Sequence, residues 1–235
     1  MANHVGNAAA SGSSPVPAPG PARPRARGRG DLTERSRERI LRSALEEFAA
    51  RGFDGTTTAA IARKAGVTQP LVHYHFTSKL ALWQAAVRMA FEVSSQAFRG
   101  VELELRDLAP LDQMKVLTRR YVRFSASHPE LARIISHESM QGGERLRWLN
   151  EETIGGHFDW FRTLYERGIA EGWMKPLPLM NVLSSLGASG AYLFMVRASM
   201  WETYGVDVTD PVVVERHADT IIELFFHGLV REVPA

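Results

Sequence analysis

The sequence contains no cysteine among its 235 residues. This absence excludes disulfide bonds, thiolate metal ligands and cysteine nucleophiles. The chain also lacks any run of about 18 uncharged apolar residues, which a membrane-spanning helix would need, so we expect no membrane partner. No stretch of useful length alternates between apolar and polar residues, the pattern that indicates half-buried strands. These absences favour an all-α protein, and a hydrophobic content of 45% is ordinary for a soluble globular chain.

Motifs for catalysis and for metal binding are also missing. There is no phosphate-binding P-loop, no glycine fingerprint after a strand and no G-x-S-x-G nucleophile elbow. His137-Glu138 lacks the second histidine of a zinc-binding H-E-x-x-H helix. His73 and His75 stand two positions apart on an expected helix and therefore point to different faces. The sequence thus predicts no enzyme, no cofactor and no metal site.

Charge is distributed unevenly although the net charge is only +2. Residues 1–100 carry 14 Lys and Arg against 7 Asp and Glu, which gives a net charge of +7. Residues 101–235 carry 14 Lys and Arg against 19 Asp and Glu, which gives a net charge of −5. A basic front half attached to an acidic rear half predicts a module that faces a polyanion.

Composition sets residues 1–30 apart from the rest of the chain. Twenty of them are Ala, Gly, Pro or Ser, which cannot bury enough surface to offset an ordering cost of about 1–2 kcal/mol per residue. We therefore expect a disordered basic tail, and it lacks the apolar core of a secretory signal. Its arginines either keep the tail solvated or neutralise DNA phosphates. They are Arg23, Arg25, Arg27 and Arg29.

Beyond the tail, apolar periodicity and Gly and Pro breaks predict about nine helices. Asp31 is the expected N-cap of the first, which ends at Gly52 because glycine adopts a left-handed backbone without steric cost. A break is expected at Gly155-Gly156. The expected helices cover residues 31–51, 59–64, 69–76, 78–98, 111–126, 129–141, 144–172, 178–204 and 211–229.

The two short helices around Gly66 have the spacing of a helix-turn-helix. Ala62 is small enough for two helix backbones to approach each other, and Gly66 permits the sharp turn between them. Ile61, Val67 and Val72 supply the small core beneath. In such a motif the second helix presents its N-terminal side chains to a major groove of DNA.

The motif and its flanks read FDGTTTxxIAxxAGVTQPLVHYHFxxKxxL over residues 53–82. In order and spacing this segment resembles the TetR family of bacterial one-component transcriptional repressors, and the resemblance covers about residues 33–85. One position departs from the pattern, because His73 stands where the family usually has Tyr. The resemblance implies a helix-turn-helix DNA-binding domain at residues 31–78. It further implies a helical ligand-binding and dimerisation domain at residues 79–235.

The side chains of the second short helix have the chemistry of groove contacts. Thr68 is its expected N-cap. Gln69 can pair in a bidentate way with adenine, and Pro70 and Leu71 offer apolar surface to a thymine methyl. His73 can donate to a base edge or to a phosphate.

The resemblance implies a further set of contacts to the sugar-phosphate backbone. Packing beneath the helices is the alternative for the aromatic members of this set, and a solvated charge is the alternative for the lysine. The implied contacts come from Thr56 or Thr57, Tyr74, His75 and Lys79.

The expected helices at 178–204 and 211–229 are apolar around most of their circumference. This pattern predicts either a self-complementary four-helix interface in a homodimer or a buried core helix in a monomer, and the need to grip two half-sites favours the dimer. Small residues at 184–191 either open space for a ligand or permit close helix packing. Aromatic residues of the rear half are the expected lining of a small-molecule cavity, unless they are plain core. The four selected are Trp160, Phe161, Tyr165 and Tyr192.

The sequence therefore predicts a cytoplasmic, homodimeric repressor that binds a palindromic operator in double-stranded DNA and is released by a small-molecule effector. The alternative is a constitutive DNA-organising protein without an effector, whose rear domain would have no cavity. An all-α enzyme that uses the aromatic residues is a third possibility, but no acid, base or nucleophile supports it.

Overall fold

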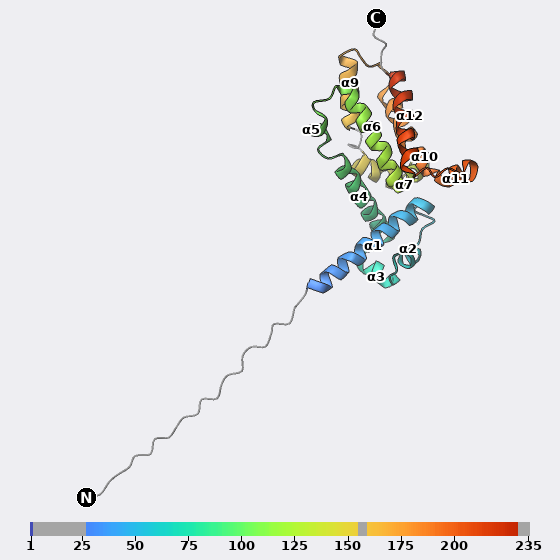
Figure 1. Ribbon diagram of the computed structural model, residues 1–235. Coiled ribbons are helices and arrows are strands. Elements are labelled where there is room, and N and C mark those ends of the chain that lie inside the picture. Colours follow the sequence, from blue (N-terminus) through green and yellow to red (C-terminus); the bar gives the residue numbers. More distant parts are fainter. Residues whose placement is uncertain (2–26, 155–158, 230–235) are drawn as a thin grey trace.

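The structure is a computed structural model that describes Met1 and residues 27–154 and 159–229 (Figure 1). Within these ranges the regular structure is helical and there is no β-strand, so the predicted all-α fold is confirmed. The elements are α1 (Arg27–Arg51), α2 (Thr58–Ala65), α3 (Gln69–His75), α4 (Lys79–Phe98), α5 (Val101–Leu105), α6 (Pro110–Ser127), α7 (Pro129–Gln141), α8 (Glu144–Leu149), the π-helical turn η1 (Asn150–Ile154), α9 (Asp159–Ala170), α10 (Leu179–Met195), α11 (Arg197–Tyr204) and α12 (Pro211–Leu229).

The first helix begins earlier than the sequence pattern predicts. α1 starts at Arg27, so Asp31 lies inside the helix and is not its N-cap. The last proline of the N-terminal segment is Pro24, so no proline ring interrupts the helix from Arg27 onward. The predicted tail of residues 1–30 is therefore wrong for residues 27–30, and residues 2–26 lie outside the described part of the chain.

Three further differences raise the number of helices above the predicted nine. The short helix α5 was not predicted; it follows Gly100, which has a φ of +75°. The expected helix at 144–172 is divided into α8, η1 and α9, and its predicted break at residues 155–156 falls outside the described residues. The expected helix at 178–204 ends at Met195 and resumes as α11, with a bend of 62° between the two parts.

A long-range contact explains the end of α10. The Arg133 guanidinium on α7 donates to the backbone carbonyls of Phe194 and Met195, at 3.3 and 2.8 Å. The last carbonyls of a helix have no amide partner within that helix, and here the guanidinium donates to two of them. Arg133 lies about sixty residues before this helix end in the chain, so the local periodicity of the sequence could not predict where α10 ends.

Local caps fix the turns around α2 and α3. The Thr57 hydroxyl accepts a hydrogen bond from the Ala60 amide at 3.1 Å and caps α2. Gly66 ends α2 with a φ of +64°, a backbone conformation that favours glycine. Ser78 caps α4 by accepting from the Ala81 amide at 3.0 Å. Each of these three residues acts on backbone groups within a few residues of itself.

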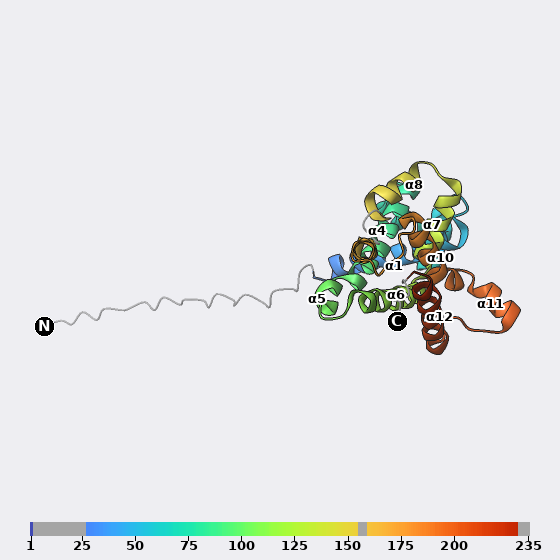
Figure 2. The ribbon, with the colours of Figure 1, turned by 90° about the horizontal axis from the view of Figure 1, so that it is seen from above.

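The helices form a front group and a rear group that α4 connects (Figure 1). In the front group, α1 packs against α2 and α4; in the rear group, α6 packs against α9, α10 and α12. The front core also includes Leu131 and Ile134 from α7 and Leu149 from α8. α7 and α8 therefore share a core with α1 although they follow the rear helix α6 in sequence. Seen from above, α11 projects away from the body of the molecule (Figure 2).

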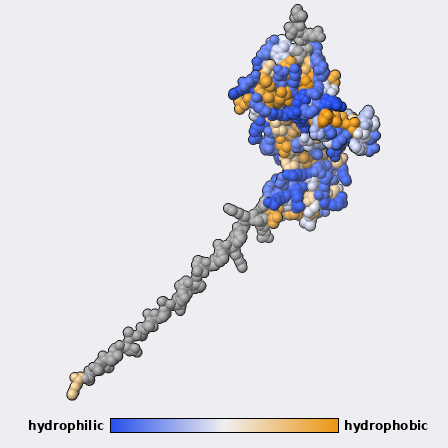
Figure 3. All heavy atoms as spheres, viewed as in Figure 1, coloured by the Kyte–Doolittle hydropathy of each residue, from blue (hydrophilic) through white to orange (hydrophobic). Residues whose placement is uncertain are grey.

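Surface character differs between the two groups. In the view of Figure 3, hydrophobic surface gathers on the rear part, while the surface around α1 is mostly hydrophilic. No single helix of the described residues is long and apolar enough to cross a membrane, and only the bent pair of α10 and α11 meets that criterion jointly.

Candidate nucleic-acid interface and ligand cavity

The second helix of the predicted motif presents one face to solvent. Val72 is buried beneath α3 with Ile61 and Ala62 of α2, so the two short helices share the small core that the sequence predicts. On the opposite side, an exposed row follows the N-terminal turns of α3 and continues towards its end. This row consists of Gln69, Pro70, His73 and Tyr74, with Leu71 half-buried beside it and Thr68 exposed at the N-cap.

Hydrogen bonds between neighbouring side chains orient Gln69. Its Nε2 donates to the Thr58 hydroxyl at 3.3 Å and lies 3.4 Å from Nε2 of His73, one helical turn away. Both contacts are exposed, so a base edge can replace them without opening the core. The arrangement holds an amide group at the surface of α3, which bidentate pairing with adenine requires.

The two aromatic residues at the end of α3 differ in their surroundings. Tyr74 is 76% exposed, so the structure does not place it beneath the helices. His75 is half-buried, and its Nε2 lies 3.4 Å from the Ser36 hydroxyl on α1. The rings of Tyr74 and His75 meet edge to face, with 5.3 Å between their centroids. Tyr74 is therefore free to reach a phosphate, whereas His75 also links α3 to α1.

The structure removes Thr56 from the predicted backbone contacts. Its side chain is only 1% exposed, and its hydroxyl donates to the carbonyls of Gly52 and Glu47, at 2.8 and 3.1 Å. Thr56 thus stabilises the turn between α1 and α2. Thr57 is exposed at the N-terminus of α2, where the helix dipole and free amides favour an anion.

Lys79 has a different environment from the solvated charge considered as an alternative. Its ammonium donates to the carbonyls of Phe53 and Thr56, at 2.9 and 3.1 Å, and lies 4.3 Å from the centroid of the Phe53 ring. An ammonium group has three N–H donors, so these bonds leave one for a phosphate. Lys79 therefore ties the start of α4 to the turn that precedes α2.

Two family models match this chain. The model described as "Bacterial regulatory proteins, tetR family" matches residues 40–86, and the model described as "Tetracyclin repressor-like, C-terminal domain" matches residues 110–224. Together they cover more than half of the chain and both of its helix groups. The chain belongs to the TetR family. It is accordingly a DNA-binding transcriptional regulator, and the family predicted from residues 53–82 is confirmed.

Curated relatives and solved structures agree with this assignment. The chain is 24% identical to the transcriptional regulator RutR of Escherichia coli over 82% of its own length and 90% of that protein. It is 25% identical to the transcriptional repressor NicS of Pseudomonas putida over 84% of its own length and 94% of that protein. In fold it is similar to the Bacillus subtilis regulator FadR in complex with stearoyl-CoA, with a TM-score of 0.59 and 18% identity. The likeness covers 81% of this chain and 98% of the FadR chain.

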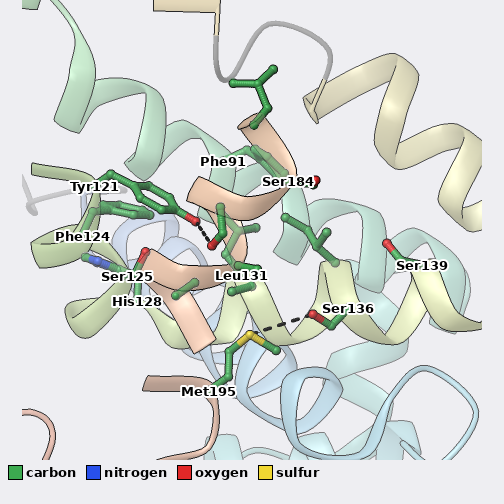
Figure 4. A pocket seen from close by; sticks show the side chains of 16 residues that line it. Phe91, Tyr121, Phe124, Ser125, His128, Leu131, Ser136, Ser139, Ser184 and Met195 are labelled. Carbon is green, nitrogen blue, oxygen red and sulfur yellow. Dashed lines mark hydrogen bonds between the residues drawn. The ribbon is translucent and has the colours of Figure 1, made fainter. Parts of the chain in front are cut away.

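The rear part of this TetR-family regulator contains a cavity of about 410 Å³ between α4, α6, α7 and α10 (Figure 4). This volume lies within the range of small-molecule sites, about 300–1,000 Å³. None of the four aromatic residues predicted for a ligand site lines it. The lining comprises Phe91, Tyr121, Phe124, Ser125, His128, Leu131, Ala132, Ile135, Ser136, Ser139, Leu183, Ser184, Gly187, Ala188, Ala191 and Met195.

The four predicted residues lie elsewhere for identifiable reasons. Phe161 and Tyr165 are fully buried in the rear core, and the Tyr165 hydroxyl donates to the carbonyls of Lys175 and Leu177. Trp160 packs against the same core and stacks on Phe98. Tyr192 is 62% exposed on the outer face of α10. The small residues at 184–191 were the better signal, because several of them line the cavity.

Replacing Lys79 with alanine should weaken binding to all DNA sequences alike. Phosphate contacts carry no base information, so the slope of log K against log salt should fall by about 1 per protomer. The carbonyls of Phe53 and Thr56 would also lose their donor, which should lower the free energy of unfolding by about 1–2 kcal/mol. Salt-dependent DNA titrations and denaturant melts measure the two effects.

Lys115→Ala on α6 is the matched control, since it removes the same charge from the rear group. A loss confined to particular operator sequences in Lys79→Ala would contradict a phosphate contact.

Proposed function

We propose that this chain is a cytoplasmic homodimeric repressor that binds a palindromic operator and releases it when a small molecule enters the cavity. Residues up to 78 would supply the DNA-binding part, and residues from 79 onward the effector and dimer part. The observation that carries the proposal is that α7 walls the cavity and also belongs to the front core. A constitutive DNA-organising protein, the alternative function, would need no such cavity.

Exposed apolar side chains on neighbouring helices support a dimer. α10 packs against α12, and Tyr192 on α10 and Leu224 on α12 are 62% and 68% exposed. Met180 and Val212 add exposed apolar surface to the same two helices. A second copy can bury this surface in a self-complementary four-helix interface. Such a dimer presents α3 twice, as two half-sites of a palindrome require.

Two helices connect the cavity with the DNA-binding part. α4 supplies Phe91 to the cavity wall and begins at Lys79, which binds the turn before α2. α7 supplies a row that includes Leu131, Ile135 and Ser139 to the wall. α7 also packs on α1. A ligand that shifts either helix therefore changes the position of α2 and α3.

An ion pair on the front side of α7 reaches the turn between α1 and α2. Glu138 is 1% exposed, and its carboxylate accepts a hydrogen bond from Arg145 Nε at 2.8 Å. The Arg145 guanidinium lies 4.3 Å from the centroid of the Phe53 ring and 3.7 Å from the Asp54 carboxylate. Phe53 is the residue whose ring and carbonyl Lys79 also contacts. The sequence pattern did not reveal this cluster, because its members come from three separate segments.

The proposed release is a population shift. A ligand that binds better to an altered position of α4 and α7 favours dimers whose α3 helices no longer match the spacing of the half-sites. By linkage, operator DNA must weaken ligand binding by the same factor, and a coupling of about 1–3 kcal/mol is typical. Stearoyl-CoA, the ligand of the FadR structure, carries phosphates for which the lining of this cavity offers no Lys or Arg.

The double variant Glu138→Gln, Arg145→Met should reduce this coupling. Arg145→Met alone leaves the Glu138 carboxylate buried without its partner and should destabilise the fold by ~3 kcal/mol. Neutralising Glu138 as well removes that penalty, so the double variant should fold and still bind both operator and ligand. The ligand should then lower the operator affinity of the double variant less than it lowers the operator affinity of the parent chain.

Operator titrations with and without ligand measure this difference, and Arg167→Met, which removes an exposed arginine on α9, is the control. Unchanged coupling in the stable double variant would show that α7 does not transmit the signal.

The proposed function as a whole is tested by titrating thermal-shift hits against a preformed operator complex. Release of DNA at ligand concentrations near the ligand's Kd is the expected result. Ligands that raise the melting temperature but leave operator affinity unchanged would contradict an effector-released repressor and favour the constitutive DNA-organising protein.

A further inference from the structure

The cavity contains no side chain with a permanent charge. Among the described residues, the sixteen that line it include no Lys, Arg, Asp or Glu. Arg133 lies on α7 beside the wall, but its guanidinium donates to the Met195 and Phe194 carbonyls at the end of α10. An ionic ligand would therefore leave water without gaining a counterion, which is strongly unfavourable.

The two titratable groups of the lining do not change this conclusion. Burial raises the pKa of Tyr121 to about 12, so its phenol stays neutral and donates to the Gly187 carbonyl at 2.9 Å. His128 is exposed at the rim and stacks on Phe124, with 4.6 Å between centroids and 15° between planes. A ligand that lies deeper in the cavity would not pair with this exposed ring.

Aromatic side chains form one end of the cavity. Tyr121 and Phe124 stand three residues apart on one face of α6, and His128, the residue at the C-cap of α6, stacks on Phe124. Phe91 adds a ring from α4 (Figure 4). From α10 the lining includes the small residues Gly187 and Ala191, and Tyr121 reaches α10, where its hydroxyl donates to the Gly187 carbonyl. Rings from α4 and α6 beside small residues of α10 suit a flat aromatic ligand.

One hydroxyl in the wall has a weak partner. Ser136 donates to the Met195 thioether, with 3.9 Å between oxygen and sulfur (Figure 4). No stronger acceptor for this hydroxyl is found in the described part of the chain. Thioether sulfur is a weak acceptor, so a ligand oxygen can replace it with a gain. The Ser184 hydroxyl is different, because it already donates to the Asn181 carbonyl at 3.2 Å.

We propose that the effector is an uncharged, flat aromatic molecule of about two or three fused rings, with a carbonyl or ether oxygen that accepts a hydrogen bond from Ser136. This inference rests on the proposed function, since it names the ligand class of the same cavity. The rings lie against Phe91, Tyr121 and Phe124, and the oxygen points to α7.

Calorimetric titration of the full-length chain with three probes of one skeleton tests the charge. The probes are 2-acetylnaphthalene, 2-naphthoate and 2-naphthylmethylammonium. The neutral ketone should bind, and both ions should bind more weakly by a factor on the order of 100 or more. Naphthoate or the ammonium probe binding as tightly as the ketone would overturn the proposal, and so would failure of the ketone to bind.

Two serine variants test the hydrogen bond. Ser136→Ala should weaken 2-acetylnaphthalene by about three- to tenfold and leave naphthalene unchanged, because only the ketone has an acceptor. Ser184→Ala is the matched control and should change neither affinity. Equal losses for both probes, or equal losses in both variants, would contradict the assigned role of Ser136.

Operator titrations separate this proposal from the function on which it rests. If 2-acetylnaphthalene binds as expected but does not release DNA, the ligand class stands and the effector-released repressor is contradicted. If the chain binds DNA but prefers an ionic probe that does release it, the function stands and the ligand class is contradicted.

Discussion

Replacing Gln69 with alanine should abolish the preference for one base pair in each half-site and lower the affinity for the preferred operator. A bidentate amide–adenine pair is worth ~1–3 kcal/mol, and a dimer makes it twice, so the total loss should be ~2–6 kcal/mol. The Gln69 amide is exposed at the start of α3, and its contacts with Thr58 and His73 cost little to replace. Binding to an operator-variant library measures the loss at each position.

Gln96→Ala on α4 is a suitable control, since its amide donates to Glu92 within the same helix. It should leave the sequence preference intact. If Gln69→Ala weakened every sequence in the library by the same factor, Gln69 would be a backbone contact and the proposed base reading would fail.

Replacing Leu224 with glutamate should convert the dimer into a monomer. Leu224 is 68% exposed on α12, in the face proposed to meet a second copy. In a self-complementary interface the substitution would bring two new carboxylates into an apolar region, which should cost several kcal/mol of dimerisation free energy. Operator affinity should fall with dimerisation, because one α3 per molecule holds only one half-site. Sedimentation at micromolar concentration and operator titration measure both effects.

Leu103→Glu on α5 provides the matched control, because Leu103 is a similarly exposed leucine outside α10 and α12. It should remain dimeric. A Leu224→Glu chain that sediments as a dimer and binds DNA like the parent would place the interface elsewhere.

The helix-turn-helix could be predicted because its determinants are local. Thr57, Gly66 and Ser78 each act on backbone groups within a few residues, so their spacing in the sequence is enough to place α2, α3 and α4. The same holds for the exposed row that begins at Gln69, since burial of Val72 fixes which face of α3 points outward.

The aromatic lining of the cavity could not be predicted, because it depends on contacts between distant segments. Phe161 and Tyr165 have the same aromatic character as Tyr121 and Phe124, yet the first pair fills the core and the second pair lines a space. The end of α10 likewise depends on Arg133, which no local pattern connects with Met195. Sequence spacing predicted which residues share a face of one helix, but it did not predict which residues of distant helices meet.

Selection of bound sequences from random double-stranded DNA by the full-length chain tests the central claim most directly. The account predicts enrichment of an inverted repeat whose half-site centres lie about one helical turn apart, ~34–36 Å, or a multiple of it. It also predicts that a ligand of the cavity reduces the recovery of these sequences. Recovery of no preferred sequence, or of an inverted repeat whose occupancy no cavity ligand changes, would contradict an effector-released repressor.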